Sequence, residues 1–246
     1  MLKRLCLLVF LLVGSLYAFD ARLNNYPEAR TYYDKATKEH DSRSAFRLAL
    51  FYEDKLHDND QAIEWYEKAY NMGSRGAPYN LGILYQDKLN NYKKAIKWYE
   101  KAYDRNIVAA SLAMGLLYKN QFNDYEKAKY WYKKAYEEGD MGGANALGFL
   151  YDVNLKKIDQ GILWYQKAAA GGHSEAINNL GRVYHEQSDD IRAGAYIFAM
   201  ANYGYSKEEV LDFLKNDWNL DRETLQKAYE LQKTLDIPKH YTGGID

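Results

Sequence analysis

Small and apolar residues recur along most of this chain at separations of three, four, seven and eight residues. This is the spacing of residues that share one face of an α-helix. The pattern itself repeats, since steps of 33 residues from Trp65 lead to Trp98, Trp131 and Trp164. An identical hexapeptide, WYEKAY, occurs at 65–70 and at 98–103. Self-similarity at a fixed period of this length predicts an all-α array in which one helical unit is stacked on itself.

The first motif of each unit is an aromatic pair between small residues. The second member of the pair is always tyrosine: Tyr33, Tyr66, Tyr99, Tyr132 and Tyr165. Small residues stand three before and four after the first member: Ala29, Ala62, Ala95, Ala128, Gly161 and Gly194, then Ala36, Ala69, Ala102, Ala135, Ala168 and Ala201. A stripe of this kind lets a neighbouring helix approach closely. We therefore expect the Trp and Tyr rings to be core and not an exposed stacking platform.

The second motif is Leu-Gly-x2-Tyr, preceded by a small residue. Its columns are Ser44, Ala77, Ala110, Gly143 and Ala176; Leu48, Leu81, Met114, Leu147 and Leu180; Ala49, Gly82, Gly115, Gly148 and Gly181; and Tyr52, Tyr85, Tyr118, Tyr151 and Tyr184. The separations are again helical. Each unit is therefore expected to be two antiparallel helices of about 12 residues, a usual helix length.

Polar and glycine residues at fixed positions predict where these helices begin and end. N-caps of the Trp-Tyr helices are expected at Asn25, Asp58, Asn91, Asp124 and Asp190, with Lys157 as an exception. The other helices are expected to be capped at Asp41, Ser74 and Asp140, with Ile107 and His173 as exceptions. Gly73, Asn106, Gly139 and Gly172, continued by Gly204, are expected to end the Trp-Tyr helices at positive φ.

The C-terminal part departs from the repeat. Ile197 stands where the period places a tryptophan, and a capping box at Ser206 to Glu209 predicts a new helix. Asp221 is expected to cap a last helix. We therefore divide the chain into a repeat array over 19–205, capping helices over 206–236 that cover the open end of the stack, and a flexible tail over 237–246.

The first 18 residues have the pattern of a secretory signal peptide. Lys3 and Arg4 precede an apolar run from Leu5 to Val13, and a small-residue exit ends at Ala18. The run is shorter than the roughly 20 residues of a membrane span, although an uncleaved anchor is an alternative. Cleavage would remove Cys6, the only cysteine, and with it any disulfide or thiolate chemistry. The expected location is the periplasm or the exterior of the cell.

Charge and motifs argue against several other classes of function. The chain has 33 basic and 34 acidic residues, and loss of Lys3 and Arg4 would leave a formal charge of −3, which does not favour nucleic acid. The five histidines show no metal-binding spacing, and no nucleophile elbow or phosphate-binding loop is present. We therefore expect no metal, no cofactor and no catalysis. A ladder of lysines is interpreted as helix C-terminal residues that complement the dipole: Lys35, Lys68, Lys101, Lys134 and Lys167.

The stretch APYNLGILYQDKLNNYKKAIKWYEKAY, residues 77–103, resembles the Sel-one-like repeat of the tetratricopeptide-repeat superfamily. The matching signs are Ala-x3-Leu-Gly-x2-Tyr and then Ala-x2-Trp-Tyr-x-Lys-Ala, which recur about five times. The resemblance implies a right-handed α-solenoid and a scaffold or adaptor role. Many repeats of the family are about 36 residues long, and here the loop inside the unit is shorter. Cysteine-rich secreted members have been described as acting on β-lactams, but this chain lacks their cysteine pairs.

Columns that vary between units are the candidates for partner binding, because invariant columns are needed by the stack. If the Leu-Gly helices line the inner curve, as the resemblance implies, two such columns face a groove. They are Phe46, Tyr79, Leu112, Asn145 and Asn178, and Glu53, Gln86, Lys119, Asp152 and His185. An extended peptide or a partner helix would fit such a groove. An ordinary hydrated surface is the alternative.

Three functions follow from this interpretation. The first is an exported, non-catalytic scaffold, most simply a monomer, that binds a partner protein or peptide. The second is an immunity protein that neutralises a toxic effector in the same compartment. The third is a hydrolase acting on β-lactams or the cell wall, which rests only on the cysteine-rich relatives.

Overall fold

The computed structural model describes residues 19–245, so the expected signal peptide at 1–18 lies outside the described residues. All regular elements within 19–245 are helical. The chain divides at Ile107 into two compact units, where the sequence predicted one array over 19–205. We call residues 19–107 the N-terminal unit and residues 108–245 the C-terminal unit. Each unit is described separately.

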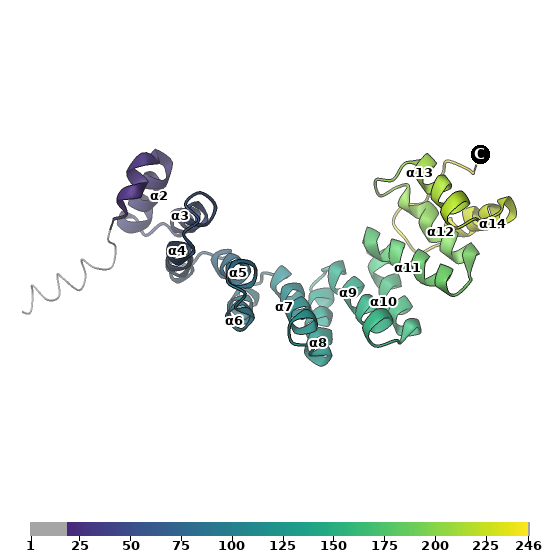
Figure 1. Cartoon of the computed structure of the whole chain (residues 1–246), viewed down its shortest axis with the longest axis horizontal. Coiled ribbons are helices and arrows are strands. Elements are labelled where there is room, and N and C mark those ends of the chain that lie inside the picture. The colour runs from purple at the N-terminus through teal and green to yellow at the C-terminus, as the bar shows by residue number, and fades with distance from the viewer. Residues whose placement is uncertain (1–18, 246) are drawn as a thin grey trace, which may run out of the picture. The chain divides into compact units, whose positions relative to one another are not determined.

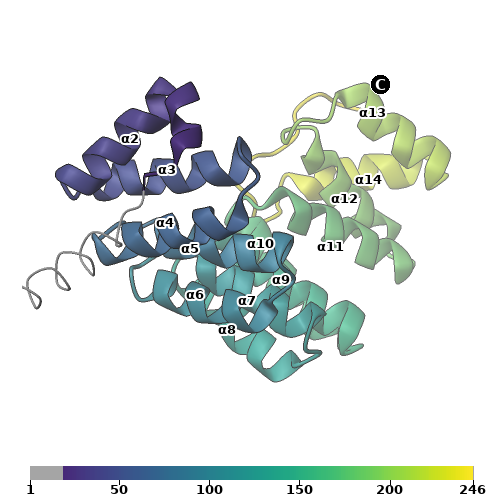
Figure 2. The same cartoon turned by 60° about the vertical axis from the view of Figure 1, so that its left-hand side comes forward.

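The N-terminal unit contains five α-helices within residues 19–107, each packed on the next (Figures 1 and 2). Its elements are the 3-10 helix η2 (Ala21–Asn25), α2 (Pro27–Lys38), α3 (Ser42–Asp54), α4 (Asn59–Asn71), α5 (Ala77–Ile83), the π-helical η3 (Leu84–Lys88) and α6 (Tyr92–Tyr103). The Leu-Gly motif lies on α3 and on α5 with η3, and it recurs on alternate helices of the C-terminal unit. Helices α2, α4 and α6 carry the aromatic pair.

The C-terminal unit continues the same alternation. Its elements are α7 (Ala109–Asn120), α8 (Tyr125–Glu137), α9 (Met141–Phe149), the π-helical η4 (Leu150–Asn154), α10 (Ile158–Ala170), α11 (Ser174–Glu186), α12 (Asp190–Met200), α13 (Lys207–Asp212), the π-helical η5 (Phe213–Asp217) and α14 (Arg222–Gln232). Helices α7 to α12 pack in sequence, and α14 closes the unit against α12. The predicted helix-turn-helix repeat is confirmed in both units.

Most of the predicted caps form, but those at Asn25, Ser74 and Asp190 do not. Asp58, Asn91 and Asp124 each accept a hydrogen bond from the backbone N–H three residues later. Asn25 instead lies in η2, and Tyr26 precedes α2. Ser74 is also not a cap, because α5 begins only at Ala77, where Pro78 in the first turn favours helix entry.

The period of 33 slips by one residue before α12, contrary to the sequence prediction. In the earlier repeats the backbone N–H of the N-cap residue donates to the carbonyl six residues before it. Asn91 donates to Tyr85 in this way, and Lys157 donates to Tyr151. The N–H of Asp189 bonds to Tyr184, only five residues back, and Asp189, not Asp190, caps α12. The connection is therefore one residue shorter.

The shorter connection changes which residues of α12 match the repeat. A Cβ on Gly181 would lie 2.6 Å from Ile197 Cδ1, so Ile197 occupies the place that tyrosine holds in the other units. Tyr196 then matches the tryptophan, and Ala193 matches Gly161 in the small column. The assignment of Ile197, Gly194 and Ala201 to the repeat columns was wrong by one residue.

The tyrosines of the aromatic pair are the centre of each core. Tyr66, Tyr99, Tyr132 and Tyr165 are at most 1% exposed. Their rings leave no room for a side chain at the glycine of the Leu-Gly motif. A Cβ on Gly115, for example, would lie 2.4 Å from Tyr132 Cδ1. The tryptophans differ from the expectation. Only Trp65 is buried, whereas Trp98, Trp131 and Trp164 are half-buried.

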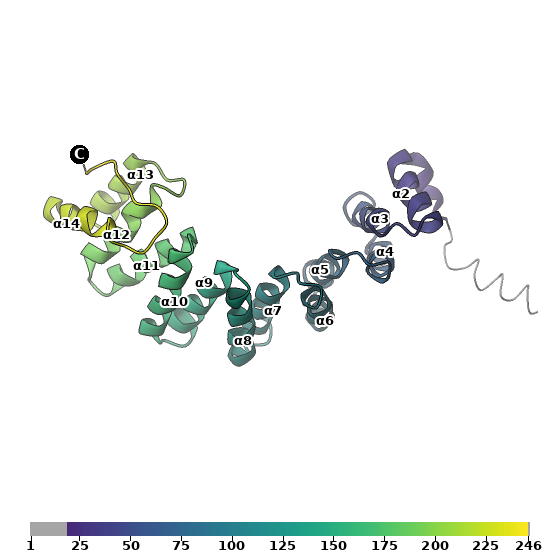
Figure 3. The same ribbon diagram turned by 180° about the vertical axis from the view of Figure 1, so that it is seen from behind.

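The segment expected to be a flexible tail packs against the C-terminal unit. Ile237 and Tyr241 are buried, and Tyr241 stacks on Phe198 of α12 at 5.7 Å between ring centroids. The buried Gln232 donates through Nε2 to the Tyr241 carbonyl at 2.6 Å and accepts from the Tyr241 N–H at 2.9 Å. Figure 3 shows this segment running beside α12 and α14.

Candidate functional site

A hydrogen bond from a buried tyrosine joins the two helices in three of the repeats. Tyr66 donates to Glu53 Oε2 at 2.7 Å, and Tyr99 donates to Gln86 Oε1 at 3.0 Å. Tyr165 donates to Asp152 Oδ2 at 3.5 Å. In each pair the acceptor stands 13 residues before the tyrosine. Burial raises the pKa of all three tyrosines above the usual range, so each hydroxyl stays protonated and needs an acceptor.

These contacts correct the premise that varying columns do not serve the fold. Glu53, Gln86 and Asp152 differ chemically, but each supplies an oxygen to a buried tyrosine. Asp152 is itself 6% exposed and also receives Arg182 Nη2 at 2.5 Å. Their variation is therefore variation among acceptors, and their role in partner binding stays a prediction.

The repeat formed by α7 and α8 departs from this series of tyrosine–acceptor pairs. Tyr132 belongs to the same column as the other three tyrosines, and the residue 13 positions before it is Lys119. A lysine ammonium can only donate hydrogen bonds. The Tyr132 hydroxyl is buried and has no hydrogen-bond partner among the described residues. Burial raises the pKa of Tyr132, so its proton stays on the oxygen.

A cavity of about 310 Å³ adjoins this tyrosine. Its lining comes from α7, α8, α9 and the start of α11: Leu112, Leu116, Lys119, Tyr132, Gly142, Asn145, Ala146, Phe149, His173 and Glu175. Leu116 and Phe149 are 41% and 37% exposed, so the cavity has an apolar rim. We call it the α7–α9 cavity.

Besides the Tyr132 hydroxyl, two polar groups of the α7–α9 cavity have no ion-pair or hydrogen-bond partner within residues 19–245. Lys119 has no ion-pair partner within residues 19–245, and its Nζ lies 4.6 Å from the centroid of the Phe149 ring. Burial lowers the pKa of Lys119, because the ammonium is partly withdrawn from water. His173 Nδ1 is also buried without a hydrogen-bond partner in the described chain. Asn145 Oδ1, by contrast, accepts from Asn179 Nδ2 at 3.0 Å.

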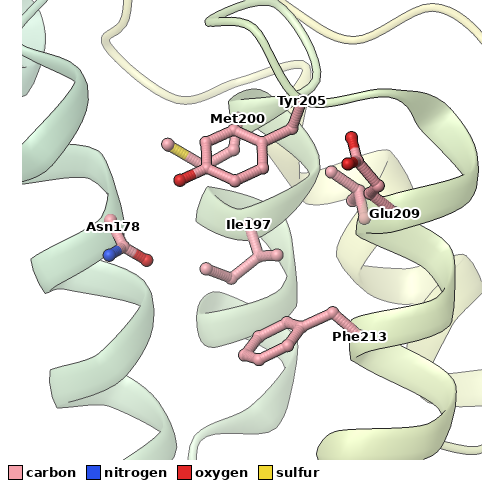
Figure 4. Close-up of a pocket in the computed structure, with 7 residues that line it drawn as sticks. Asn178, Ile197, Met200, Tyr205, Glu209 and Phe213 are labelled. Carbon is pink, nitrogen blue, oxygen red and sulfur yellow. The ribbon is translucent and has the colours of Figure 1, made fainter.

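A second cavity, of about 400 Å³, lies between α11, α12 and α13 of the C-terminal unit. Figure 4 shows Tyr205 lying over Met200 and Ile197, with Phe213 below and Asn178 facing them from α11. Its lining is mostly apolar, and Tyr205 is 52% exposed. Of the predicted groove residues, only Asn178 lines it.

The other predicted groove residues are engaged within their own unit. The Phe46 ring lies 5.7 Å from Tyr66, and the Tyr79 ring lies 5.6 Å from Tyr99. His185 stacks on Trp218 at 4.2 Å, and its Nδ1 lies 2.7 Å from Asp190 Oδ1. The α7–α9 cavity therefore brings together three of the ten: Leu112, Lys119 and Asn145.

Three lysines of the ladder pack on the tryptophans of their repeats. Lys68 Nζ lies 4.2 Å from the Trp65 ring centroid, and Lys101 Nζ lies 3.7 Å from that of Trp98. Lys167 Nζ lies 3.9 Å from that of Trp164. Such cation–π contacts stabilise a helix surface, which agrees with the structural interpretation of these lysines.

Residues 19–245 also lack two other kinds of feature. No group of three or more His, Cys, Asp or Glu side chains is placed to hold a metal ion in that range. No helix there combines the length and the apolar character that crossing a bilayer requires.

Comparison with known families and structures agrees with this architecture. The Sel1 repeat matches residues 12–41, 42–74, 108–140 and 143–173, and a tetratricopeptide repeat matches residues 79–106. The chain belongs to the Sel1 repeat family. The predicted resemblance is thereby confirmed, and the tetratricopeptide match covers most of the gap between the second and third Sel1 repeats.

Solved structures with the same fold include three repeat proteins. The protective antigen c5321 of uropathogenic Escherichia coli, which displays an SLR fold, is 25% identical with a TM-score of 0.61. That match covers 84% of this chain but only 48% of the antigen. A Sel1 repeat protein from Oxalobacter formigenes is 22% identical, with a TM-score of 0.57 and coverage of 87% and 97% of the two chains. YrrB, a TPR protein with an unusual peptide-binding site, is 18% identical, with a TM-score of 0.50 and coverage of 76% and 99%. No curated protein matches the sequence.

Proposed function

We propose that this chain is an exported, non-catalytic scaffold that binds a partner protein at the surface around the α7–α9 cavity. The observation that carries this proposal is the break in the series of tyrosine–acceptor pairs at Lys119 and Tyr132. In three other repeats the residue 13 positions before the tyrosine accepts a hydrogen bond from it, whereas within residues 53–165 the α7–α8 repeat alone carries a lysine there, beside a cavity. Stacked repeats of this kind present extended surfaces to partners.

Export is supported by the sequence of the first 18 residues. A charged start, a short apolar run and a small-residue exit direct a chain to secretion. N-terminal sequencing of protein recovered from the periplasm or the medium should find Phe19 as the first residue. An intact N-terminus on membrane-bound protein would instead establish the retained anchor.

Co-purification tests the binding function. Tagged wild type, Lys119→Glu and Lys93→Glu are expressed in the native host and compared by quantitative mass spectrometry. Lys93 is an exposed lysine of α6, so Lys93→Glu changes the charge equally at a site away from the cavity. At least one protein should be lost about tenfold with Lys119→Glu and retained with Lys93→Glu. Equal recovery of every protein would sink the proposal.

The immunity function differs from the scaffold function in the partner and not in the kind of surface. It predicts that the protein lost with Lys119→Glu is a toxic effector and that cells expressing the wild type survive it. A partner that does not harm cells without this chain would exclude the immunity role and leave the scaffold role standing.

A further inference from the structure

The neighbouring repeats show which chemical group the Tyr132 hydroxyl lacks. In three other repeats the tyrosine of this column donates to a carboxylate or amide oxygen: Glu53, Gln86 and Asp152. Two of these three acceptors are carboxylates. The helix pair of α7 and α8 keeps the donor but carries Lys119 at the acceptor position. The α7–α8 repeat thus keeps the tyrosine donor in place but has no oxygen at the acceptor position.

An external carboxylate would satisfy the Tyr132 hydroxyl and the Lys119 ammonium together. One oxygen would accept from the Tyr132 hydroxyl, and the negative charge would pair with the Lys119 ammonium, which has no anionic partner within residues 19–245. An amide would offer only the acceptor, and an ammonium would be repelled. Lys119 and Tyr132 both line the α7–α9 cavity.

The walls of the cavity restrict what carries that carboxylate. Leu112, Leu116 and Phe149 are apolar, and the volume of about 310 Å³ is at the lower end for ligand pockets. A side chain entering from a peptide fits this size better than a large free ligand. Glu175 is exposed at the start of α11, so a second negative charge would be unfavourable on that side.

We propose that the α7–α9 cavity binds an acidic side chain, glutamate or aspartate, of a partner peptide whose flanking residues are apolar. The incoming carboxylate takes the place that Glu53 occupies beneath Tyr66. This proposal rests on the protein-binding function proposed above, and it specifies the chemistry of the segment that is bound.

A peptide selection tests this chemistry directly. A random library of peptides with acetylated N-termini and amidated C-termini is selected on the full mature chain, and a second library keeps free C-terminal carboxylates. Peptides enriched from the blocked library should share one acidic residue with apolar neighbours. A synthetic copy with glutamine in place of the acid should bind at least tenfold more weakly.

Four variants make the selection specific. Lys119→Glu and Lys119→Gln supply the acceptor from within the chain, as Glu53 and Gln86 do, and both should weaken binding of the enriched peptide at least tenfold. Tyr132→Phe should weaken it several-fold, whereas Lys93→Glu should leave it unchanged. Thermal melts check that all four variants remain folded. Because two different substitutions replace Lys119, misfolding of one of them cannot explain a loss of binding by both.

Other outcomes overturn the proposal. Enrichment only from the library with free C-termini would assign the cavity to a terminal carboxylate. Enriched peptides without an acid, equal binding by the Lys119 variants, or no enrichment at all would each reject an acidic side chain. The proposed function would fail separately, when co-purification finds no protein that depends on Lys119.

Discussion

At the scale of single residues, three of the repeats join their two helices through a tyrosine hydroxyl and a side-chain oxygen that accepts from it. Tyr66, Tyr99 and Tyr165 find that oxygen on the preceding helix of their own unit. Tyr132 does not find one within residues 19–245, and its hydroxyl is buried. A buried donor without an acceptor costs roughly 1–3 kcal/mol. The same substitution should therefore have opposite effects at two positions of one column.

We expect Tyr66→Phe to destabilise the chain and Tyr132→Phe to stabilise it or leave it unchanged. Tyr66→Phe removes a hydrogen bond to a carboxylate, worth about 1.5–3 kcal/mol, and leaves Glu53 without this donor. Tyr132→Phe removes only an unpaired hydroxyl, with an expected gain of about 1 kcal/mol. Denaturant unfolding followed by circular dichroism measures both. Equal losses at the two positions would show that Tyr132 has an acceptor in solution.

We expect Gly115→Ala to destabilise the C-terminal unit by about 2 kcal/mol, as overpacking of a core does. Its Cβ would lie 2.4 Å from Tyr132 Cδ1, and a fully buried ring has little room to move. Gly76→Ala is the control, because a Cβ there would lie 3.8 Å from the Phe46 ring and meet ordinary contact. The gain of helix propensity cannot offset the clash at Gly115. Similar stability of the two variants would contradict this packing.

At the scale of elements, the repeat pattern predicted the helices and most of their caps, but it did not predict the register of α12. Stepping by 33 residues could not detect the one-residue deletion, because the small residues come in adjacent pairs there. Gly194 lies beside Ala193, and Asp190 lies beside Asp189. Either member satisfies the pattern. The hydrogen bond from Asp189 to Tyr184 and the packing of Ile197 on Gly181 decide between them.

The cap of α12 gives a test of this register. We expect Asp189→Ala to cost about 1 kcal/mol, the usual value for an N-cap, because its side chain accepts from the Arg192 N–H at 3.0 Å. Asp190→Ala should cost less, since it removes only an exposed pair with His185. The unfolding free energies of the two variants measure the difference. A larger loss at Asp190 would restore the unbroken period.

The candidate site was only partly predictable from the sequence. Leu112, Lys119 and Asn145 were selected because they vary between repeats, and all three line the α7–α9 cavity. Tyr132 was dismissed because its column never varies. The signal that would have found it is the residue 13 positions before each tyrosine of the column. Within residues 53–165 this residue carries a side-chain oxygen in every repeat except at Lys119. That separation has meaning only once two helices are packed, so a helical pattern alone does not reveal it.

At the scale of the whole molecule, each unit is an uninterrupted stack, and the C-terminal unit is closed by the segment after α14. Ile237 and Tyr241 are buried in that unit, although no helical period predicted their contacts. They were missed because a segment of turns and irregular backbone leaves no repeating pattern in a sequence. A stack needs a last element that covers its open core, and here the segment shares that role with the capping helices.

We expect Tyr241→Ala to lower the stability of the C-terminal unit by about 3 kcal/mol, the usual range for removing a buried aromatic ring. The ring stacks on Phe198, and the backbone of Tyr241 holds both ends of the buried Gln232 amide. Thermal unfolding measures the loss, with Lys239→Ala as a control on the same segment. An unchanged melting temperature would support the flexible tail that the sequence suggested.

Photo-crosslinking from the rim of the α7–α9 cavity tests the central claim most directly. A photoreactive phenylalanine analogue replaces Leu116, which lines the cavity, or Leu163, which is 59% exposed on α10 outside it. After irradiation of living cells, position 116 should form an adduct with one partner, joined near an acidic residue, and position 163 should not. No adduct at position 116, or the same adducts at both positions, would contradict the account.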